Sequence, residues 1–147
     1  MKTAREPVVA PRTAGTGRLL LLAALGAWTI LPPYLGPVMG LELDVAPRVE
    51  VVDHVVPGVA VIVGAAAALV YLRQGRGRLG DILPMSAIGL AFLASFWVTS
   101  THVPLIAEAA RGESDWGAAI LHNTAGLPVA LVSLWILATA LLAPTEG

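Results

Sequence analysis

Three histidines are the residues of this chain with the widest chemistry. His54, His102 and His122 are its only histidines in 147 residues, and the chain contains no cysteine. Imidazole nitrogens ligate haem iron and other transition metals and exchange protons near neutral pH. The absence of cysteine excludes disulfides, thiolate-bound metal clusters and cysteine nucleophiles. Any site chemistry therefore depends on where the histidines lie in the fold.

Two of the histidines stand in a repeated pattern, each followed by a glycine one helical turn later. The pairs are His54 with Gly58 and His122 with Gly126. On facing helices of a bundle the two imidazoles would be suitable axial ligands for haem b, and the glycines would leave room for the flat macrocycle. A haem-binding or quinone-linked redox protein is therefore one hypothesis. The alternative is that these histidines are interfacial or hydrogen-bonded across helices.

The third histidine belongs to a polar helix face. Ser95, Thr99 and His102 follow the spacing i, i+4, i+7, which places them on one side of a helix. A metal ion on all three histidines is a further alternative, but no carboxylate is expected on the inner faces, so no metal site is predicted. Phosphate-binding glycine loops, paired intramembrane carboxylates and the Gly-x-Ser-x-Gly motif are absent. The sequence assigns no catalytic residue, and an enzyme is the less favoured interpretation.

The composition indicates what surrounds these residues. Hydrophobic residues make up 56% of the chain and charged residues only 13%, and the mean hydropathy is +0.78. Soluble domains carry about a quarter charged residues. The expected partner is therefore the lipid bilayer, together with other membrane proteins or a second copy of the chain, and no nucleic acid.

Four apolar segments are long enough to cross a bilayer, which takes about 20 helical residues. They cover approximately Leu19–Val38, Val51–Leu72, Ile82–Ile106 and Trp116–Leu142. The expected fold is all-α, a four-helix transmembrane bundle over residues 18–143 that follows a disordered basic tail, 1–17. Pro32 and Pro33 predict a kink in the first segment. A cleaved signal peptide is the alternative for this segment, although no convincing cleavage site follows it.

The distribution of positive charge predicts the orientation. Seven of the nine Lys and Arg residues lie in the N-terminal tail or between the second and third segments. The other two gaps are acidic. Because cytoplasmic loops are enriched in Lys and Arg, both termini are expected in the cytoplasm of a multi-pass cell-membrane protein. The three histidines would then lie towards the outer leaflet, above a membrane midplane with few polar residues.

The chain also contains a weak internal sequence similarity. Shifting it by 68 residues superimposes His54 and Gly58 on His122 and Gly126, which suggests two tandem hairpins related by a pseudo-twofold axis along the membrane normal. With Trp28, the pair Pro33-Tyr34 and the pattern His54 to Gly58, the chain resembles the SPW-repeat membrane family. The second unit departs from that pattern. The resemblance implies an architecture, and the family implies no activity beyond a structural or accessory role.

Overall fold

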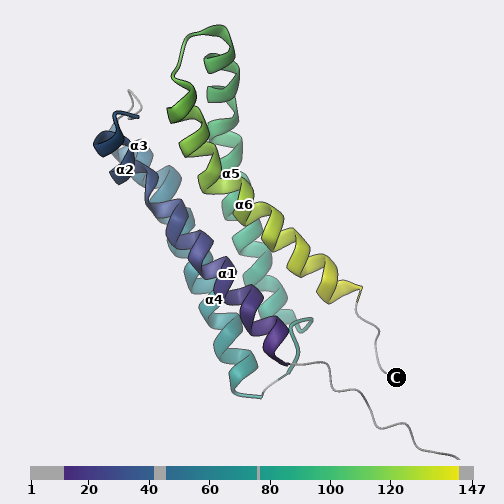
Figure 1. Ribbon diagram of the computed structural model, residues 1–147. Coiled ribbons are helices and arrows are strands. Elements are labelled where there is room, and N and C mark those ends of the chain that lie inside the picture. Colours follow the sequence, from purple (N-terminus) through teal and green to yellow (C-terminus); the bar gives the residue numbers. More distant parts are fainter. Residues whose placement is uncertain (1–11, 42–45, 76, 143–147) are drawn as a thin grey trace, which may run out of the picture.

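Helices account for all regular structure in the described part of the chain. The computed structural model describes residues 12–41, 46–75 and 77–142 (Figure 1). Predictions for the basic tail up to residue 11, and for Glu42, Asp44 and Arg76, fall outside these ranges. The elements are α1 (Arg12–Ile30), α2 (Pro32–Met39), α3 (Pro47–Glu50), the π-helical turn η1 (Val51–Val55), α4 (Val56–Arg73), α5 (Ile82–Arg111) and α6 (Trp116–Leu141).

The first apolar segment is a bent pair of helices. α1 and α2 meet at Leu31 with an angle of 51° between them. Pro32 and Pro33 have no amide hydrogen, so two helical hydrogen bonds are lost at this point and the axis bends. The predicted kink is therefore confirmed. The helix begins at Arg12, earlier than the expected Leu19.

Three helices have the length and composition of membrane spans. They are α5, α6 and the continuous helical run Arg48–Arg73, formed by α3, η1 and α4; the bent pair α1 and α2 is a fourth if it crosses as one unit. In the most apolar window of each of the three helices only 28% is buried. The remaining apolar side chains face outward, as expected for helices surrounded by lipid.

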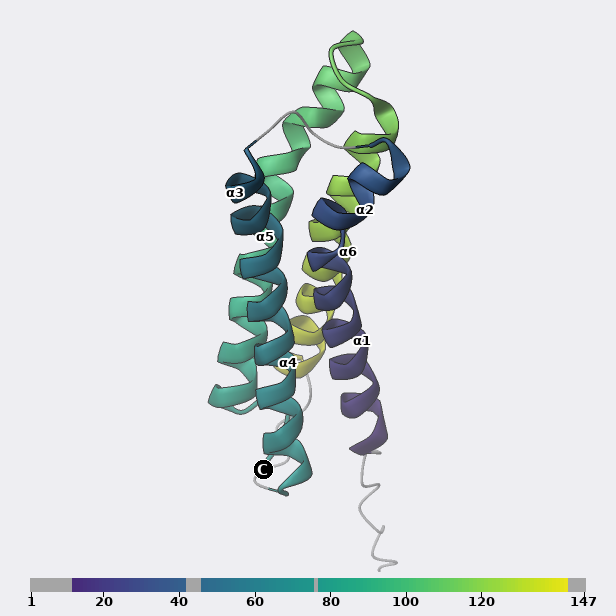
Figure 2. The same cartoon turned by 90° about the vertical axis from the view of Figure 1, so that its left-hand side faces the viewer.

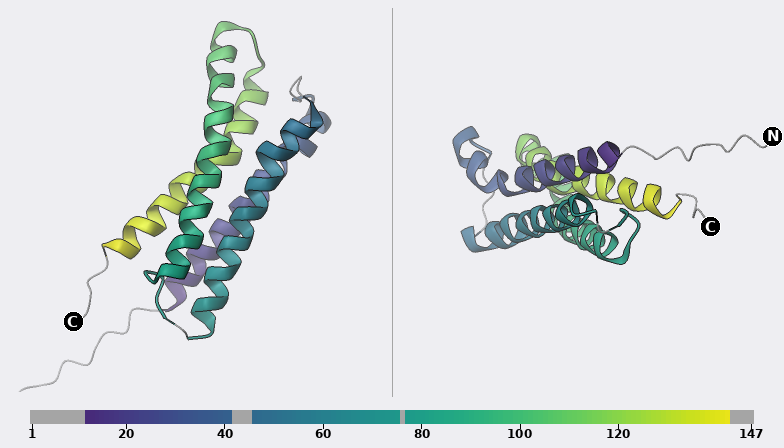
Figure 3. Two further views of the ribbon diagram at one scale, coloured as in Figure 1. Left: turned by 180° about the vertical axis from the view of Figure 1, so that it is seen from behind. Right: turned by 90° about the horizontal axis from the view of Figure 1, so that it is seen from below.

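The four long helices form a ring in which each packs on two neighbours. α1 lies against α4 and α6, and α5 lies against α4 and α6, as the end-on view in Figure 3 shows. α5 has 30 residues and is therefore about 45 Å long, against about 30 Å for the hydrocarbon layer. Its hairpin with α6 accordingly extends beyond the α2 and α3 end of the bundle (Figures 1 and 2).

The core of the bundle is aliphatic in the half where α1 begins and α6 ends. Its buried members come from all four long helices: Leu19, Leu22, Val61, Ala65, Ala68, Ile88, Ala91, Val129 and Ile136. The predicted inner faces of the second and fourth segments are confirmed by burial. The second half of α6 diverges from α5 (Figure 3). Pro128 lies inside this helix and removes a backbone hydrogen bond there.

The two capping carboxylates behave differently. Asp115 accepts a hydrogen bond from the Ala118 amide at 3.0 Å and so caps the start of α6. Asp81 precedes α5, but its side chain makes no cap bond to that helix. It accepts instead from the Arg78 amide and the Tyr71 hydroxyl. A turn and a neighbouring helix therefore offer this carboxylate donors other than the start of α5.

Glycine permits the close approach of α1 and α4. A Cβ atom added to Gly58 would lie 2.7 Å from the Gly26 carbonyl oxygen and 2.5 Å from Ile30 Cγ1. Backbone atoms cannot move aside as a flexible side chain can. The Gly26–Gly58 contact is thus a small-residue helix interface of the kind that membrane proteins use in place of hydrophobic burial.

We expect Gly58→Ala to lower the free energy of unfolding by about 1–3 kcal/mol, because overpacking at a helix contact forces the helices apart. Gly89→Ala is the matched control, since an added Cβ there has nothing within 4 Å and alanine favours helix by up to about 1 kcal/mol. Thermal unfolding in detergent, followed by tryptophan fluorescence, measures both variants. Equal melting temperatures for the two would contradict the close packing of α1 on α4.

Candidate functional site: a cluster of three histidines

The three histidines lie at one depth in the bundle. His54 and His122 stand 19 residues from the ends of their helices at Arg73 and Leu141, and His102 stands 20 residues from Ile82, where α5 begins. At 1.5 Å per residue these distances are all about 28–30 Å. This is about the thickness of the hydrocarbon layer. If the inner helix ends lie at its inner boundary, the histidines lie at the outer one.

The imidazole rings pack against one another. The ring centroids of His54 and His102 are 4.6 Å apart, those of His54 and His122 are 5.2 Å apart, and those of His102 and His122 are 5.6 Å apart. His54 and His122 are fully buried and His102 is 5% exposed. Residues from three helices, up to 68 positions apart in sequence, therefore form one compact cluster.

Each ring is fixed by the same kind of hydrogen bond, from Nδ1 to a backbone carbonyl. His102 Nδ1 lies 2.7 Å from the Val98 oxygen, and His122 Nδ1 lies 2.9 Å from the Ala118 oxygen. His54 Nδ1 lies 3.2 Å from the Thr29 oxygen, across the α1–α4 interface. A carbonyl oxygen only accepts, so Nδ1 carries the hydrogen in all three rings. In the neutral tautomer each Nε2 therefore keeps a free lone pair.

The acceptor for His54 is available because of the proline pair in α1. In a regular helix the Thr29 carbonyl would accept from the amide of residue 33, and here that residue is Pro33. The side chain of Thr29 makes a second contact, to α6, since its hydroxyl donates to the Ala125 oxygen at 2.6 Å. Thr29 thus joins α1 to α4 through its backbone and to α6 through its side chain.

The Nε2 atoms are the unusual feature of the cluster. Those of His54 and His122 are buried and have no hydrogen-bond partner. Leaving a buried polar atom unpaired costs about 1–3 kcal/mol, and in a membrane no bulk water compensates. Two such atoms in one cluster indicate a place where a ligand, a proton or a water molecule belongs.

A carboxylate also reaches the cluster. Glu50 Oε1 lies 3.7 Å from His122 Nε2, and the Glu50 side chain is only 15% exposed. Glu50 lies in a gap that the sequence indicates to be acidic, but helix α3 runs directly into η1 and α4 and brings its carboxylate inside. Even so, no described group of side chains completes a metal site as placed.

A π-helical turn, η1, lies between Glu50 and Pro57. In η1 the Val56 amide donates to the Val51 oxygen, which is the wider i to i+5 pattern. Pro57, which follows, cannot donate to the Asp53 carbonyl, and in an α-helix its ring would clash with that oxygen. The wider turn avoids the clash, and π-helical turns are frequent at functional sites.

The histidine cluster is not arranged as a finished metal site. As the side chains stand, the described residues contain no group of three or more His, Cys, Asp or Glu residues that could hold a metal ion. The rings of His102 and His122 are stacked, with 16° between their planes, so their nitrogens do not converge on one point. The three rings are therefore close together, but their nitrogens are not directed at a common ligand.

The two glycines beside the histidines have a packing role. The space beside Gly58 is filled by Ile30 and Gly26. A Cβ atom on Gly126 would lie 2.5 Å from Thr99 Oγ1 and 2.7 Å from the Thr99 amide nitrogen. Neither glycine leaves open space of the kind predicted for a macrocycle. Haem ligation by His54 and His122 stays a prediction, and this packing favours a smaller ligand between the rings.

The three residues of the polar face predicted on α5 lie on the side of that helix that packs within the bundle. Ser95 and His102 are buried, whereas Thr99 is half-buried. The two hydroxyls donate to carbonyls of their own helix, Ser95 to Phe92 and Thr99 to Ser95. They therefore satisfy themselves locally and line the helix contact, and neither hydroxyl is bonded to an imidazole.

Side-chain hydrogen bonds that the sequence did not indicate join the helices around the histidine cluster. Asn123 Nδ2 donates to the His102 carbonyl oxygen at 2.9 Å. Trp28 Nε1 donates to Thr124 Oγ1 at 3.3 Å, and Trp97 Nε1 donates to Asp53 Oδ1 at 3.1 Å. The sequence signal for these bonds was the presence of polar residues at equal depth on several expected spans. Their pairing depends on helix rotation, which the sequence does not define.

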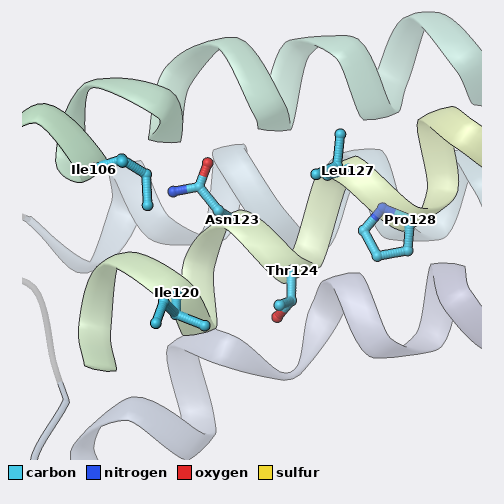
Figure 4. Close-up of a pocket in the computed structure, with 6 residues that line it drawn as sticks. All are labelled: Ile106, Ile120, Asn123, Thr124, Leu127 and Pro128. Carbon is cyan, nitrogen blue, oxygen red and sulfur yellow. The ribbon is translucent and has the colours of Figure 1, made fainter. Parts of the chain in front are cut away.

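A shallow depression lies on the outer surface of the same end, apart from the imidazoles. It has a volume of about 170 Å³ and is lined by Ile106, Ile120, Asn123, Thr124, Leu127 and Pro128 (Figure 4). Its lining is almost entirely apolar, and it is open along the flank of α6. A lipid chain at this depth is sufficient to fill it, and none of the three histidines lines it.

Comparison with known proteins gives no family to set beside this geometry. Neither a protein-family model, nor a curated protein, nor a solved structure matches the chain. Only a broad class of protein can therefore be defined. It is an all-α chain with three or four candidate membrane spans packed as a bundle.

We expect Thr29→Val to destabilise the protein by about 1 kcal/mol, because an interhelical hydrogen bond in a membrane protein is worth about that much. Valine keeps the shape of threonine and leaves the Ala125 oxygen without this donor. Ser100→Ala is the control, since the Ser100 hydroxyl bonds only to Trp97 on its own helix and is exposed. Melting temperatures in detergent compare the two. A loss no larger for Thr29→Val than for Ser100→Ala would contradict the role given to Thr29.

Proposed function

We propose that this protein is a four-span cell-membrane protein of structural or accessory type, with both termini in the cytoplasm. The observation that carries the proposal is the apolar outer surface of the bundle. Large side chains such as Leu90, Leu93, Leu131 and Leu134 are more than half exposed on α5 and α6. The polar groups of Thr29, Asn123 and the histidines bond within the bundle. Such a surface is suited to lipid and to the helices of another membrane protein.

The bent pair α1 and α2 is proposed to cross the bilayer as one span. Leu19 and Leu22 are buried in the core against the other helices, so α1 is an integral part of the fold, which supports retention over cleavage as a signal peptide. At the inner end of α1, Arg18 donates to Thr139 Oγ1 at 2.8 Å and lies 4.4 Å from the Trp135 ring centroid. This contact supports a common depth for the two helix ends.

Two finer hypotheses follow from the sequence. The first is membership of the SPW-repeat family with a tandem duplication, supported by the equal depth of His54 and His122 in the bundle. The second is a haem-binding or quinone-linked redox role, supported by the placement of these two histidines on separate helices with rings 5.2 Å apart. The packing of Gly58 and Gly126 weighs against haem, and the absorption spectrum of the purified protein tests it.

Single-cysteine labelling tests the topology, because the chain contains no native cysteine that could also react. We expect a membrane-impermeant maleimide to label Met39→Cys and Ser114→Cys in intact cells. Gly17→Cys and Gln74→Cys should react only after the membrane is permeabilised, because positive loops stay inside. External labelling of Gly17→Cys together with Met39→Cys would contradict the first crossing. Labelling of Gln74→Cys from outside would reverse the orientation.

Site-specific photo-crosslinking in cells tests the accessory role. A photoreactive residue at Leu93 or Leu131, both about 60% exposed, should yield an adduct of defined mass with a membrane protein or a second copy of this chain. The control is the same residue at Val63, about equally exposed but on α4, which separates a specific face from random contact. Adducts with lipid alone at Leu93 and Leu131 would rule out a protein partner at these positions.

A further inference from the structure

We propose that His54, His102, His122 and Glu50 form a binding site for one divalent transition metal ion at the outer end of the bundle. This inference concerns the histidine cluster and is independent of whether the apolar surface binds a protein partner. Three observations support it: the spacing of the rings, the Nδ1 hydrogen bond of each ring, and the buried Nε2 atoms that have no partner, one of them near the Glu50 carboxylate.

The spacing of the imidazoles matches that of a three-histidine site. A zinc ion lies about 2.0–2.1 Å from each ligating nitrogen and about 3.2 Å from each ring centroid, so tetrahedral geometry sets the centroids about 5 Å apart. The three separations found are 4.6, 5.2 and 5.6 Å. A haem between two axial rings would require a wider gap, because the iron lies in line between the two nitrogens.

The hydrogen bonds of the cluster are those of metal-binding histidines. A ligating imidazole usually donates its other ring N–H to a carbonyl or carboxylate, which fixes the tautomer and directs the free lone pair at the metal. Here Val98, Ala118 and Thr29 supply the three carbonyls. The Nε2 atoms that remain are the ligands, and two of them have no partner.

Glu50 turns this cluster into a cation site. The Nε2 atom of His122, with Nδ1–H donated to Ala118, offers a lone pair, and so does the Glu50 carboxylate 3.7 Å away. Two acceptors this close need a positive species between them. A tetrahedral zinc ion bound to both would place nitrogen and oxygen about 3.3 Å apart, within a few tenths of an ångström of the observed distance. The competing occupant is a proton.

Loading requires the rings to turn. As the side chains are placed, no described group of them holds a metal ion. The Nε2 lone pairs converge only when the stacked rings of His102 and His122 turn about both their Cα–Cβ and Cβ–Cγ bonds, while the ring centroids already have the right separation. Three nitrogens and a carboxylate suit Zn²⁺, Cu²⁺, Ni²⁺ or Co²⁺. The depth of about 28–30 Å from the inner helix ends places the entry on the outer side.

The test uses the full chain in detergent, purified on a tag without histidine and treated with a chelator. Zn²⁺ binding is measured by titration calorimetry, and Co²⁺ added to the same protein reports coordination through its visible d–d bands. We expect one ion per chain and tetrahedral-type Co²⁺ bands that Zn²⁺ displaces. His102→Ala and His122→Ala should each weaken Zn²⁺ binding by about 100-fold or more, since loss of a ligand exceeds the 10–100-fold cost of losing an outer-shell partner.

Glu50→Gln and Glu113→Gln form the matched pair for the carboxylate. Glu50→Gln should weaken Zn²⁺ binding about 10-fold or more, whereas Glu113→Gln should leave it unchanged, because Glu113 is exposed and paired with Arg111. Melting curves without metal show whether each variant folds. The Co²⁺ spectrum of the unaltered protein tests metal binding without depending on any variant. Absence of stoichiometric Zn²⁺ and Co²⁺ binding to the unaltered chain would overturn the proposal in favour of a proton. A Soret band lost in His54→Ala would overturn it in favour of haem.

Discussion

The hydrogen bonds from three imidazole Nδ1 atoms to backbone carbonyls are the constraint that organises the end of this bundle where the histidines lie. In a low-dielectric interior each polar group needs a partner, and no bulk water is at hand to supply one. These bonds fix the tautomer and the orientation of each ring. The His54 bond also crosses to α1 and so depends on helix packing. The same bonds leave the Nε2 atoms as the only free polar atoms of the rings.

The prolines make this arrangement available. Pro33 removes the amide that would occupy the Thr29 carbonyl, and this oxygen then accepts from His54. Pro57 disfavours an α-helical turn before it, and the wider turn η1 occupies this place, between Pro57 and the Glu50 carboxylate that lies near His122. Helix-breaking residues are tolerated in membrane helices when neighbours satisfy the groups that they free. Here the neighbour that satisfies the freed oxygen is an imidazole, so the kink and the site share one cause.

The sequence predicted the parts of the structure that depend on periodicity and composition. Long apolar runs define α4, α5 and α6, and the paired prolines predicted the bend at Leu31. Spacing of three and four residues correctly placed His54 and His122 on buried faces. These features follow from the helix repeat and from the cost of polar groups in lipid, so a single sequence is enough to predict them.

The remaining features depend on rotation and local distortion, which a helical pattern does not contain. Glu50 was assigned to an acidic loop because charge near a span end normally lies outside the membrane. In fact the helix begins at Pro47, before the expected Val51, and Glu50 lies four residues before His54, a spacing that places both on one helix face. Gly58 and Gly126 were interpreted as open space for a cofactor. Glycine permits either a void or a close backbone, and only the neighbours Ile30 and Thr99 decide between them.

The two halves of the bundle therefore differ in kind, with aliphatic packing in one and a set of imidazole hydrogen bonds in the other. The direct measurement of the histidine half is ¹⁵N NMR of the protein labelled at its three histidines, in detergent and without metal. The structure predicts three neutral Nδ1–H tautomers whose ring protons exchange slowly with water. Imidazole shifts that are averaged between tautomers, or Nε2–H forms at His54 and His122, would contradict it.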